Sequence, residues 1–284
     1  IVTGLVGSEM CIRDRELTVK RISLVLLALV SSLAFADDHK GLDWETALSG
    51  DHRSESNSGR DQYRHPRETL DFFGLSAEMT VLEVSPGGGW YTEVLAPLLK
   101  DHGQLVAGHG APNGSAYGRR SLGGYLQKLG RAHDVYSAVD VRVMQPPAMP
   151  LGVEAGSVDM ALVFRNVHSW LRAGTAEASL ADIHRALKSG GTLGIVQHRG
   201  TDGMTVEQMK RTAYVPESKV IEMAEAAGFE LDGKSEINAN AKDTKDYPGG
   251  VWTLPPSFGA GDDNRAKYAA IGESDRMTLR FRKP

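Results

Sequence analysis

Three consecutive glycines, Gly87 to Gly89, form the part of the sequence best suited to binding a ligand through the backbone. They follow an apolar run, MTVLEV, and precede an apolar helical pattern, so they are expected to connect a strand to a helix. Residues without side chains let the backbone approach a ligand closely, and a helix N-terminus offers unpaired N–H groups and positive potential. The stretch lacks the Lys of phosphate loops and the G-x-G-x-x-G spacing of dinucleotide binders. We therefore predict ligand contacts at Gly87, Gly88 and Gly89, with a purely structural turn as the alternative.

A second polar group follows two later apolar runs, at residues 158–164 and 192–197. The sequence after the first run is RNVHSW, with Arg165, Asn166 and His168, and His198 follows the second run. A histidine can act as a general base near neutral pH, and an asparagine can orient a ligand by hydrogen bonds. We predict Asn166 and His168 as catalytic residues and Arg165 and His198 as substrate contacts. Loop residues that bond only to backbone or solvent are the alternative.

A third polar cluster, RDQYRH, lies upstream and contains Arg60, Tyr63 and His65. Arginine presents a planar fork to a carboxylate or phosphate, so we predict these three residues as substrate contacts. An ion-paired structural clasp is the alternative. The nine histidines show no recognisable metal-ligand spacing, and the single cysteine, Cys11, excludes a disulfide or a cysteine-ligated metal within the chain, so we predict no metal site.

The elements that must position these residues alternate between strands and helices. The strands expected from apolar runs or alternation are 79–84, 104–108, 138–144, 158–164, 192–197, 229–235 and 277–281. The helices expected between or before them are 42–48, 66–73, 90–99, 122–129, 175–187, closed by Gly190 and Gly191, and 216–227. This order predicts an α/β fold with a doubly wound, mostly parallel, seven-stranded sheet and an antiparallel last strand. The ligand crevice of such a sheet lies at the carboxyl ends of its central strands.

From Pro66 to Pro284 the sequence resembles a class I S-adenosylmethionine-dependent methyltransferase, and more narrowly an exported, uncharacterised family of predicted methyltransferases. The pieces that carry the resemblance are RDQYRHPRETLDFFGL, TVLEVSPGGGWYTEVLAPLL, VDMALVFRNVHSWL, LKSGGTLGIVQHR and GESDRMTLRFRKP. The resemblance implies S-adenosylmethionine as the cofactor. Glu83 matches the acid that supports the glycine-rich turn and the methionine end of the cofactor, and Ser85 replaces the usual first glycine.

Two further positions are assigned to the cofactor by the same resemblance. His109 stands where an acid normally accepts both ribose hydroxyls, and a neutral imidazole offers one acceptor at most. Gln145 stands where an Asp usually bonds the adenine amine, and its amide oxygen can keep one such bond. The resemblance therefore implies a cofactor site with a weaker ribose contact than usual.

The sequence of the N-terminal region indicates that the protein is exported. Residues 1–16 resemble translated adaptor sequence, and we interpret them as an artefact. Residues 17–36 have the basic, apolar and small-residue regions of a signal peptide, with cleavage after Ala36; a membrane anchor is the alternative, although the apolar stretch is short. We assign 37–65 to a polar segment and 66–284 to the methyltransferase-like domain. Residues 237–274 form an insertion between the last two strands, which we interpret as a cap on the acceptor side.

The overall charge of the chain argues against nucleic acid as a partner. The 284 residues carry a formal net charge of −4, which gives no basic footprint for nucleic acid. We predict a periplasmic or secreted enzyme that transfers a methyl group to a small molecule or an envelope component, without a membrane anchor after cleavage. The alternative is a non-catalytic ligand-binding protein on a methyltransferase scaffold. The sequence does not fix the oligomeric state.

Overall fold

The computed structural model describes residues 41–262 and 264–284, so the predicted signal peptide and the stretch before it lie outside the described residues. The polar segment that follows forms three short helices, α1 (Trp44–Ser49), α2 (Glu55–Ser58) and α3 (Asp61–Arg64). The helix expected at 42–48 is confirmed as α1, whose first turn is capped by the Asp43 carboxylate. Within the described part of the chain, no helix has the length and apolar character needed to cross a membrane.

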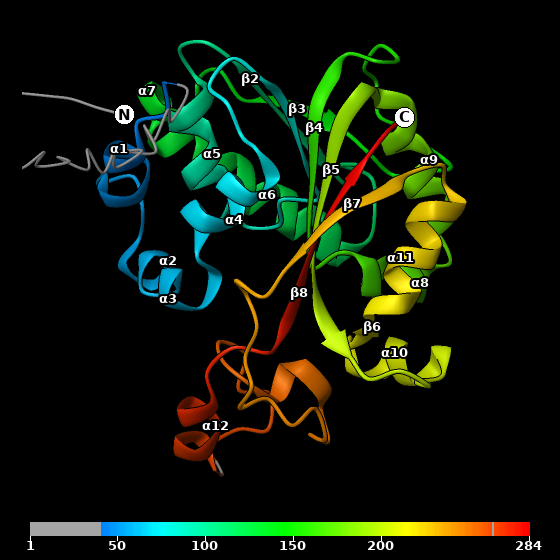
Figure 1. The fold of residues 1–284 in the computed structure, drawn as a ribbon. Coiled ribbons are helices and arrows are strands. Elements are labelled where there is room, and N and C mark those ends of the chain that lie inside the picture. Colours follow the sequence, from blue (N-terminus) through cyan, green and yellow to red (C-terminus); the bar gives the residue numbers. More distant parts are fainter. Residues whose placement is uncertain (1–40, 263) are drawn as a thin grey trace, which may run out of the picture. The chain divides into compact units, whose positions relative to one another are not determined.

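Seven strands form the main sheet, in the order β3-β2-β1-β4-β5-β8-β7, and a short eighth strand, β6, pairs with β5 (Figure 1). Their bounds are β1 (Thr80–Val84), β2 (Gln104–His109), β3 (Asp140–Val143), β4 (Val158–Phe164), β5 (Leu187–Gly200), β6 (Val215–Pro216), β7 (Glu230–Ser235) and β8 (Arg276–Arg282). Strands β1 to β5 are parallel to one another, and β8 is antiparallel to β5 and β7. The predicted sheet with an antiparallel last strand is confirmed.

Helices cover both faces of the sheet (Figure 1). The longer ones are α4 (Pro66–Phe73), α5 (Thr92–Leu99), α6 (Ala116–Arg131), α9 (Ala176–Ala186) and α11 (Glu217–Ala226). Short ones are α7 (His133–Tyr136), α8 (Val167–Ala173), α10 (Val206–Thr212) and α12 (Arg265–Ile271). Alternate residues of β4 enter the two hydrophobic cores: Leu162 packs with α4 and α5, and Val163 packs with α9 and α11. Burial on both faces explains why the strands read as continuous apolar runs.

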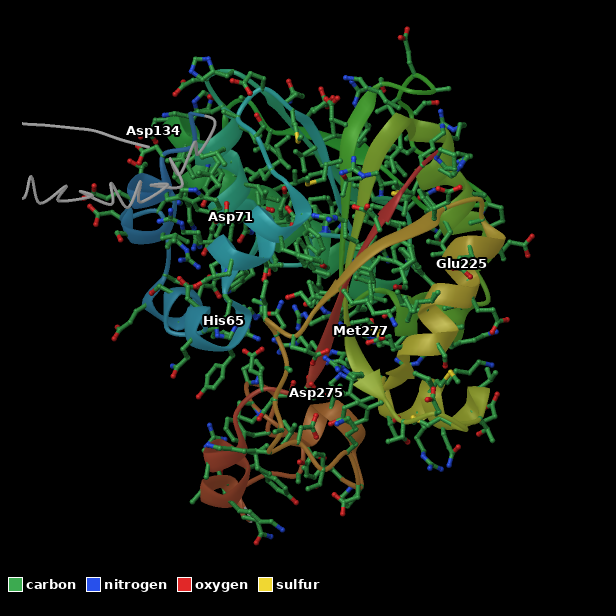
Figure 2. The ribbon with its side chains drawn as sticks, viewed as in Figure 1. His65, Asp71, Asp134, Glu225, Asp275 and Met277 are labelled. Atoms are coloured by element: carbon green, nitrogen blue, oxygen red, sulfur yellow. The ribbon has the colours of Figure 1, made fainter. Side chains whose placement is uncertain are left out.

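Helix α11 shows how the polar faces point outward. It buries Val220 and Ala224 against the sheet, whereas Glu225 is exposed; Figure 2 shows Glu225 on this helix and Met277 on β8 inside the sheet. Such an apolar stripe facing a sheet is the pattern from which the helix was predicted.

Two helix boundaries differ from the sequence prediction. The helix expected to close at Gly190 and Gly191 ends instead at Ala186, because Leu187 is extended and begins β5; the two glycines lie inside that strand. The helix expected at 122–129 is the longer α6, whose first turn is capped by the Ser115 hydroxyl. In both cases the cap residue, rather than the apolar pattern, sets the boundary.

The stretch between β7 and β8 packs against the N-terminal helices. It contains the 3-10 helix η1 (Gly250–Thr253) and α12. The Asn238 amide donates hydrogen bonds of 2.9 Å to the hydroxyls of Thr69 and Thr278. Gly272 lies so close to the ring of Tyr63 that an added Cβ would be 2.8 Å from it. Residues more than 160 positions apart are thereby held together at one end of the sheet.

Candidate functional site

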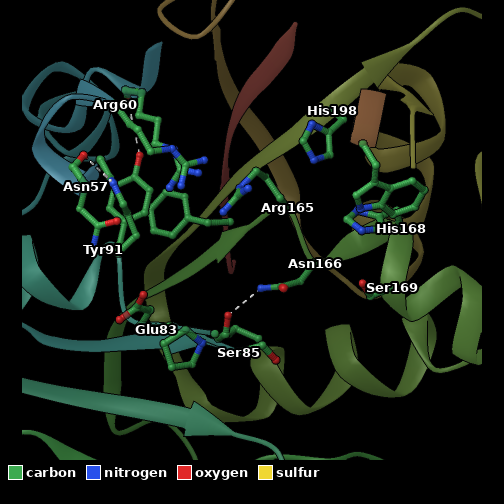
Figure 3. A pocket seen from close by; sticks show the side chains of 18 of the residues that line it. Asn57, Arg60, Glu83, Ser85, Tyr91, Arg165, Asn166, His168, Ser169 and His198 are labelled. Carbon is green, nitrogen blue, oxygen red and sulfur yellow. Dashed lines mark hydrogen bonds between the residues drawn. The ribbon is translucent and has the colours of Figure 1, made fainter. Parts of the chain in front are cut away.

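The glycine-rich loop lies at the point where the strand order reverses, between β1 and β4. Ser85 and Gly87 both have positive φ, at 50° and 62°, so the chain turns sharply after β1. The Ser85 N–H donates to the Gly108 carbonyl (2.8 Å), and the Asn166 amide donates to the Val84 carbonyl (2.7 Å; Figure 3). Asn166 thus ties the loop after β1 to the loop after β4, which is a positioning role.

A first cavity of about 410 Å³ opens beside this loop. Most of the predicted site residues line it: Arg60, Glu83, Ser85, Gly87, Gly88, Arg165, Asn166, His168 and His198. Figure 3 shows Arg60 and Tyr91 on one side, His168 and His198 on the other, and Arg165 between them. Residues from β1, α3, β4, α8 and β5 therefore meet at one site.

A second cavity of about 560 Å³ lies on the other side of the same loop. It contains both residues that the resemblance assigned to the nucleoside, His109 and Gln145. The two cavities share five lining residues, which are Ser85, Gly87, Tyr117, Asn166 and Ser169. The loop is thus a ridge between two adjacent cavities, and one extended ligand that crosses it can contact both.

Three predicted residues do not line either cavity. Gly89 packs under Tyr125, and an added Cβ would lie 3.0 Å from its ring, so this glycine serves the packing of the turn. Tyr63 packs against Gly272, and its carbonyl accepts a hydrogen bond from Arg276 (3.1 Å). His65 is the left-handed residue between α3 and α4 (φ 40°). The structure gives these three residues structural contacts in place of the predicted ligand contacts.

Glu83 is a buried carboxyl at the cavity floor. The Thr92 hydroxyl donates to it at 2.6 Å and also lies 3.3 Å from the Tyr125 hydroxyl. Burial raises the pKa of Glu83 to about 7, against the lowering effect of the Thr92 hydrogen bond and of Lys128. Its charge is therefore sensitive to any cation that enters the cavity.

His109 and Gln145 stand at the carboxyl ends of β2 and β3. His109 Nε2 is 3.4 Å from the Gly87 carbonyl, and its Nδ1 is buried with no partner among the described residues. Burial lowers the pKa of His109, so the ring is neutral at pH 7. The Gln145 amide oxygen accepts from the Ala111 N–H (3.3 Å). Both side chains are hydrogen-bonding groups without charge.

His168 and His198 lie side by side, with ring centroids 5.6 Å apart. Burial lowers the pKa of His168 to about 4, and burial together with Arg276 lowers the pKa of His198 well below its usual value. The Gln197 amide nitrogen is 3.4 Å from His168 Nδ1, and His198 Nδ1 is 2.5 Å from the Ser274 hydroxyl. Both rings are neutral at pH 7, which makes His168 a weak base and a good hydrogen-bonding group.

Three arginines bind one carboxylate at the edge of the first cavity, and a fourth lines a small cavity together with it. The Glu273 carboxylate accepts from Arg60 Nε (2.5 Å), Arg64 Nε (3.3 Å) and Arg276 Nη2. Burial alone would raise the pKa of Glu273, but Arg276 and Arg64 hold it far below its usual value. The fourth arginine, Arg165, is in the left-handed region (φ 63°) directly after β4. We call these five residues the arginine cluster.

Sequence reasoning missed several members of the site. Tyr117 and Ser169 line both cavities, and Trp252, from the insertion, closes the first one against the His168 ring (centroids 6.0 Å apart). Their positions depend on how α6, α8 and η1 pack, for which the sequence holds no local signal. In the part of the chain that the structure describes, no group of three or more His, Cys, Asp or Glu side chains is placed to hold a metal ion.

No protein-family model matches the sequence, and no curated protein matches it either. Solved structures do resemble it. A SAM-dependent methyltransferase from Aquifex aeolicus is 17% identical with a TM-score of 0.52, covering 80% of this chain and 93% of that one. The N-methyltransferase NodS from Bradyrhizobium japonicum WM9 is 16% identical with a TM-score of 0.50, covering 80% of this chain and 96% of that one. The chain has the Rossmann-like fold of SAM-dependent methyltransferases.

The fold expected from the sequence resemblance is therefore confirmed. It does not fix the reaction, because the cyclase SpnF matches the chain too, with 19% identity, a TM-score of 0.56 and coverage of 87% of this chain and 88% of that one. The reaction must be argued from the residues of the two cavities.

Proposed function

We propose that the protein is an exported methyltransferase that uses S-adenosylmethionine to methylate a small molecule or an envelope component. The observation that carries the proposal is the pair of cavities meeting at the glycine-rich loop, at the switch point of a methyltransferase-like sheet. Sheets of this kind bind ligands at that point.

The residues present fit the cofactor. A Cβ added at Gly87 or Gly88 would meet no atom within 4 Å, so the backbone there borders open space and can be approached closely. His109, whose buried Nδ1 has no partner among the described residues, and Gln145 suit the nucleoside in the second cavity. Glu83 suits the positively charged methionine end in the first cavity, because a nearby cation favours the ionised carboxylate. When bound, the cofactor supplies a methyl group on a positively charged sulfur.

The chain's own contribution is alignment. Methyl transfer is an in-line displacement, whose rate depends on holding the reacting groups in register. Asn166 fixes the loop geometry, and His168 supplies a neutral ring at the cavity wall. With the Gln197 amide donating to Nδ1, the hydrogen of His168 is on Nε2, so this ring donates a hydrogen bond to the methyl acceptor. His168 is thereby an orienting group rather than a general base.

The proposed export rests on the sequence of residues 17–36, which lie outside the described residues. The order of basic, apolar and small residues supports a cleaved signal. The test is N-terminal sequencing of the protein recovered from a periplasmic extract. A mature chain starting at Asp37 supports export, and an uncleaved chain in the cytoplasmic fraction contradicts it.

Calorimetric titration of the full chain with S-adenosylmethionine and S-adenosylhomocysteine tests the cofactor assignment. Gly88→Val is the sharp variant, because Gly88 lines the first cavity and its Cβ would meet no protein atom. The matched control is Gly152→Val, at an exposed loop glycine that also has open space around it and lines neither cavity. We expect binding by the wild type and Gly152→Val, and at least tenfold weaker binding by Gly88→Val. Absence of binding by both compounds at millimolar concentration would contradict the proposal.

A non-catalytic ligand-binding protein is the second candidate function. His109 favours it, since a neutral imidazole replaces the acid that would accept two ribose hydroxyls. This candidate predicts that neither S-adenosyl compound binds, while another ligand occupies the first cavity.

A further inference from the structure

The arginine cluster carries more positive charge than the protein neutralises. Arg60, Arg64 and Arg276 share the single carboxylate of Glu273. Asp275, two positions after Glu273, pairs with Arg199 and Lys245 instead. Four guanidinium groups against one carboxylate leave a formal excess of three positive charges.

Several donors of the cluster are buried without a partner. Both Nη atoms of Arg64, Nη2 of Arg60 and Nε of Arg276 have no hydrogen-bond partner among the described residues, and the side chain of Arg64 is only 3% exposed. Buried donors without partners cost free energy, and a buried charge that lacks compensation costs more. Native proteins retain few such groups, and a water molecule, an ion or a ligand group can complete their hydrogen bonds.

Arg165 is the member of the cluster whose side chain forms neither a hydrogen bond nor an ion pair with the described residues. It is nevertheless half-buried at the wall of the first cavity. Burial, followed by the charge of Arg276, lowers the pKa of Arg165 to about 10, which still leaves it charged at pH 7. Its backbone is held at a positive φ, a conformation that a non-glycine residue rarely adopts. The five N–H donors of the Arg165 guanidinium are thus free to bind a ligand in the first cavity.

The cluster lies on one side of the glycine-rich loop. Arg60, Arg64 and Arg165 line the first cavity, beside His168 and Trp252, and none of them lines the second cavity with its nucleoside-type residues. Arg165 and Arg276 also border a smaller cavity of about 70 Å³, whose lining includes Trp252 of the insertion. The excess charge therefore faces the first cavity, which in the proposed function holds both the methionine end of the cofactor and the methyl acceptor.

We propose that the arginine cluster is a binding site for an oxyanion, a phosphate or carboxylate group carried by the methyl acceptor. A guanidinium matches the two oxygens of either group with parallel hydrogen bonds. The excess of three positive charges suits a doubly charged group. The assignment of the oxyanion to the methyl acceptor rests on the proposed function, whereas the oxyanion site itself rests on the arginine cluster.

The first test uses inorganic phosphate and malonate as probes, with the full chain in chloride buffer at constant ionic strength. Either probe should raise the melting temperature of the wild type, since a ligand that binds the native state stabilises it. Stabilisation by phosphate alone identifies a phosphate-type group, and stabilisation by malonate alone a carboxylate-type group. If neither probe stabilises the protein, the proposal is overturned.

Arg165→Met is the decisive variant, because it removes a charge that forms no ion pair or hydrogen bond with the described residues. We expect it to bind the stabilising probe at least tenfold more weakly and, without the probe, to melt no lower than the wild type. The control is Arg282→Met. Arg282 lies at the opposite end of the sheet, where it stands across from Thr192 in the register of β8 and β5. An equal loss of probe binding in Arg282→Met would show a general charge effect and overturn the site. A lower melting temperature of Arg165→Met without the probe, with unchanged probe affinity, would show a structural role and also overturn it.

Competition separates the two proposals. Simultaneous binding of the probe and S-adenosylhomocysteine assigns the cluster to the acceptor. One-for-one displacement would instead assign it to the cofactor's own carboxylate and overturn the inference. Binding of the probe without any binding of S-adenosylhomocysteine would leave the oxyanion site in place and remove the methyltransferase proposal.

Discussion

Glu83 makes the stability of the protein depend on pH in a direction opposite to that of most carboxylates. The carboxyl is 2% exposed, and burial raises its pKa from 4.5 to about 7. Between these two values the folded state binds more protons than the unfolded state, so stability falls as the pH rises. A pKa change of this size corresponds to about 3 kcal/mol, fully present below pH 4.5 and lost once the pH has passed 7.

Glu83→Gln removes the titrating group while keeping the shape of the side chain. The assay is urea unfolding of wild type and variant at several pH values from 4.5 to 8.5, analysed as the difference in unfolding free energy at each pH. Using the difference cancels contributions from groups common to both proteins, such as the buried His168. We expect the wild type to lose about 3 kcal/mol relative to Glu83→Gln across this range.

Thr92→Val supplies a matched second variant. The hydroxyl of Thr92 donates to the Glu83 carboxylate and lowers the Glu83 pKa, so its removal should push that pKa higher. The pH-dependent loss of stability should then be larger and extend to higher pH. If the difference between wild type and Glu83→Gln stays flat within about 0.5 kcal/mol, Glu83 is not a protonated buried group and the reasoning about this site is refuted.

Two further predictions concern the cofactor site and the core. His109→Asp should tighten binding of S-adenosylhomocysteine about tenfold or more, since a carboxylate accepts both ribose hydroxyls with charge-assisted hydrogen bonds. Calorimetry measures this affinity. The control is His102→Asp, at an exposed position, which should leave the affinity unchanged. Unchanged affinity in His109→Asp would remove His109 from the ribose site. Gly194→Ala should cost about 1–3 kcal/mol in chemical unfolding because its Cβ would lie 2.8 Å from the Phe73 ring. Gly124→Ala, exposed within α6 with open space around it, should instead add about 0.5–1 kcal/mol; equal effects would contradict the packing.

The strands of the main sheet and the longer helices between them were predictable because their signals are local. A strand buried on both faces is a continuous apolar run, as in residues 158–164, and α4 is marked by Pro66 at its start and Gly74 after its end. Helices α2 and α3 were not predictable. They are four residues long without an apolar stripe, and distant contacts hold them, such as the Trp90 indole donating to the Asn57 carbonyl.

The residues of the site also divide into those with a local signal in the sequence and those without one. Residues that directly follow a strand, such as Ser85 and Arg165, were predictable, because the carboxyl ends of parallel strands meet at one edge. The pairing of the arginines with Glu273 was not predictable, since Arg64 and Glu273 are separated by 209 positions and neither carries a sign of its partner. Tyr63 and His65 were predicted in place of Arg64, because only the unforeseen helix α3 decides which neighbour faces the cavity.

The central claim is that an S-adenosyl compound binds across the ridge formed by the glycine-rich loop. The most direct measurement is ultraviolet cross-linking of methyl-labelled S-adenosylmethionine to the full chain, followed by mass spectrometric mapping of the labelled peptide. We predict label on the residues that line the two cavities around Ser85 to Tyr91, and its loss when unlabelled S-adenosylhomocysteine is added in excess. Label mapping to any other face of the protein, or label that the competitor does not displace, would contradict the claim.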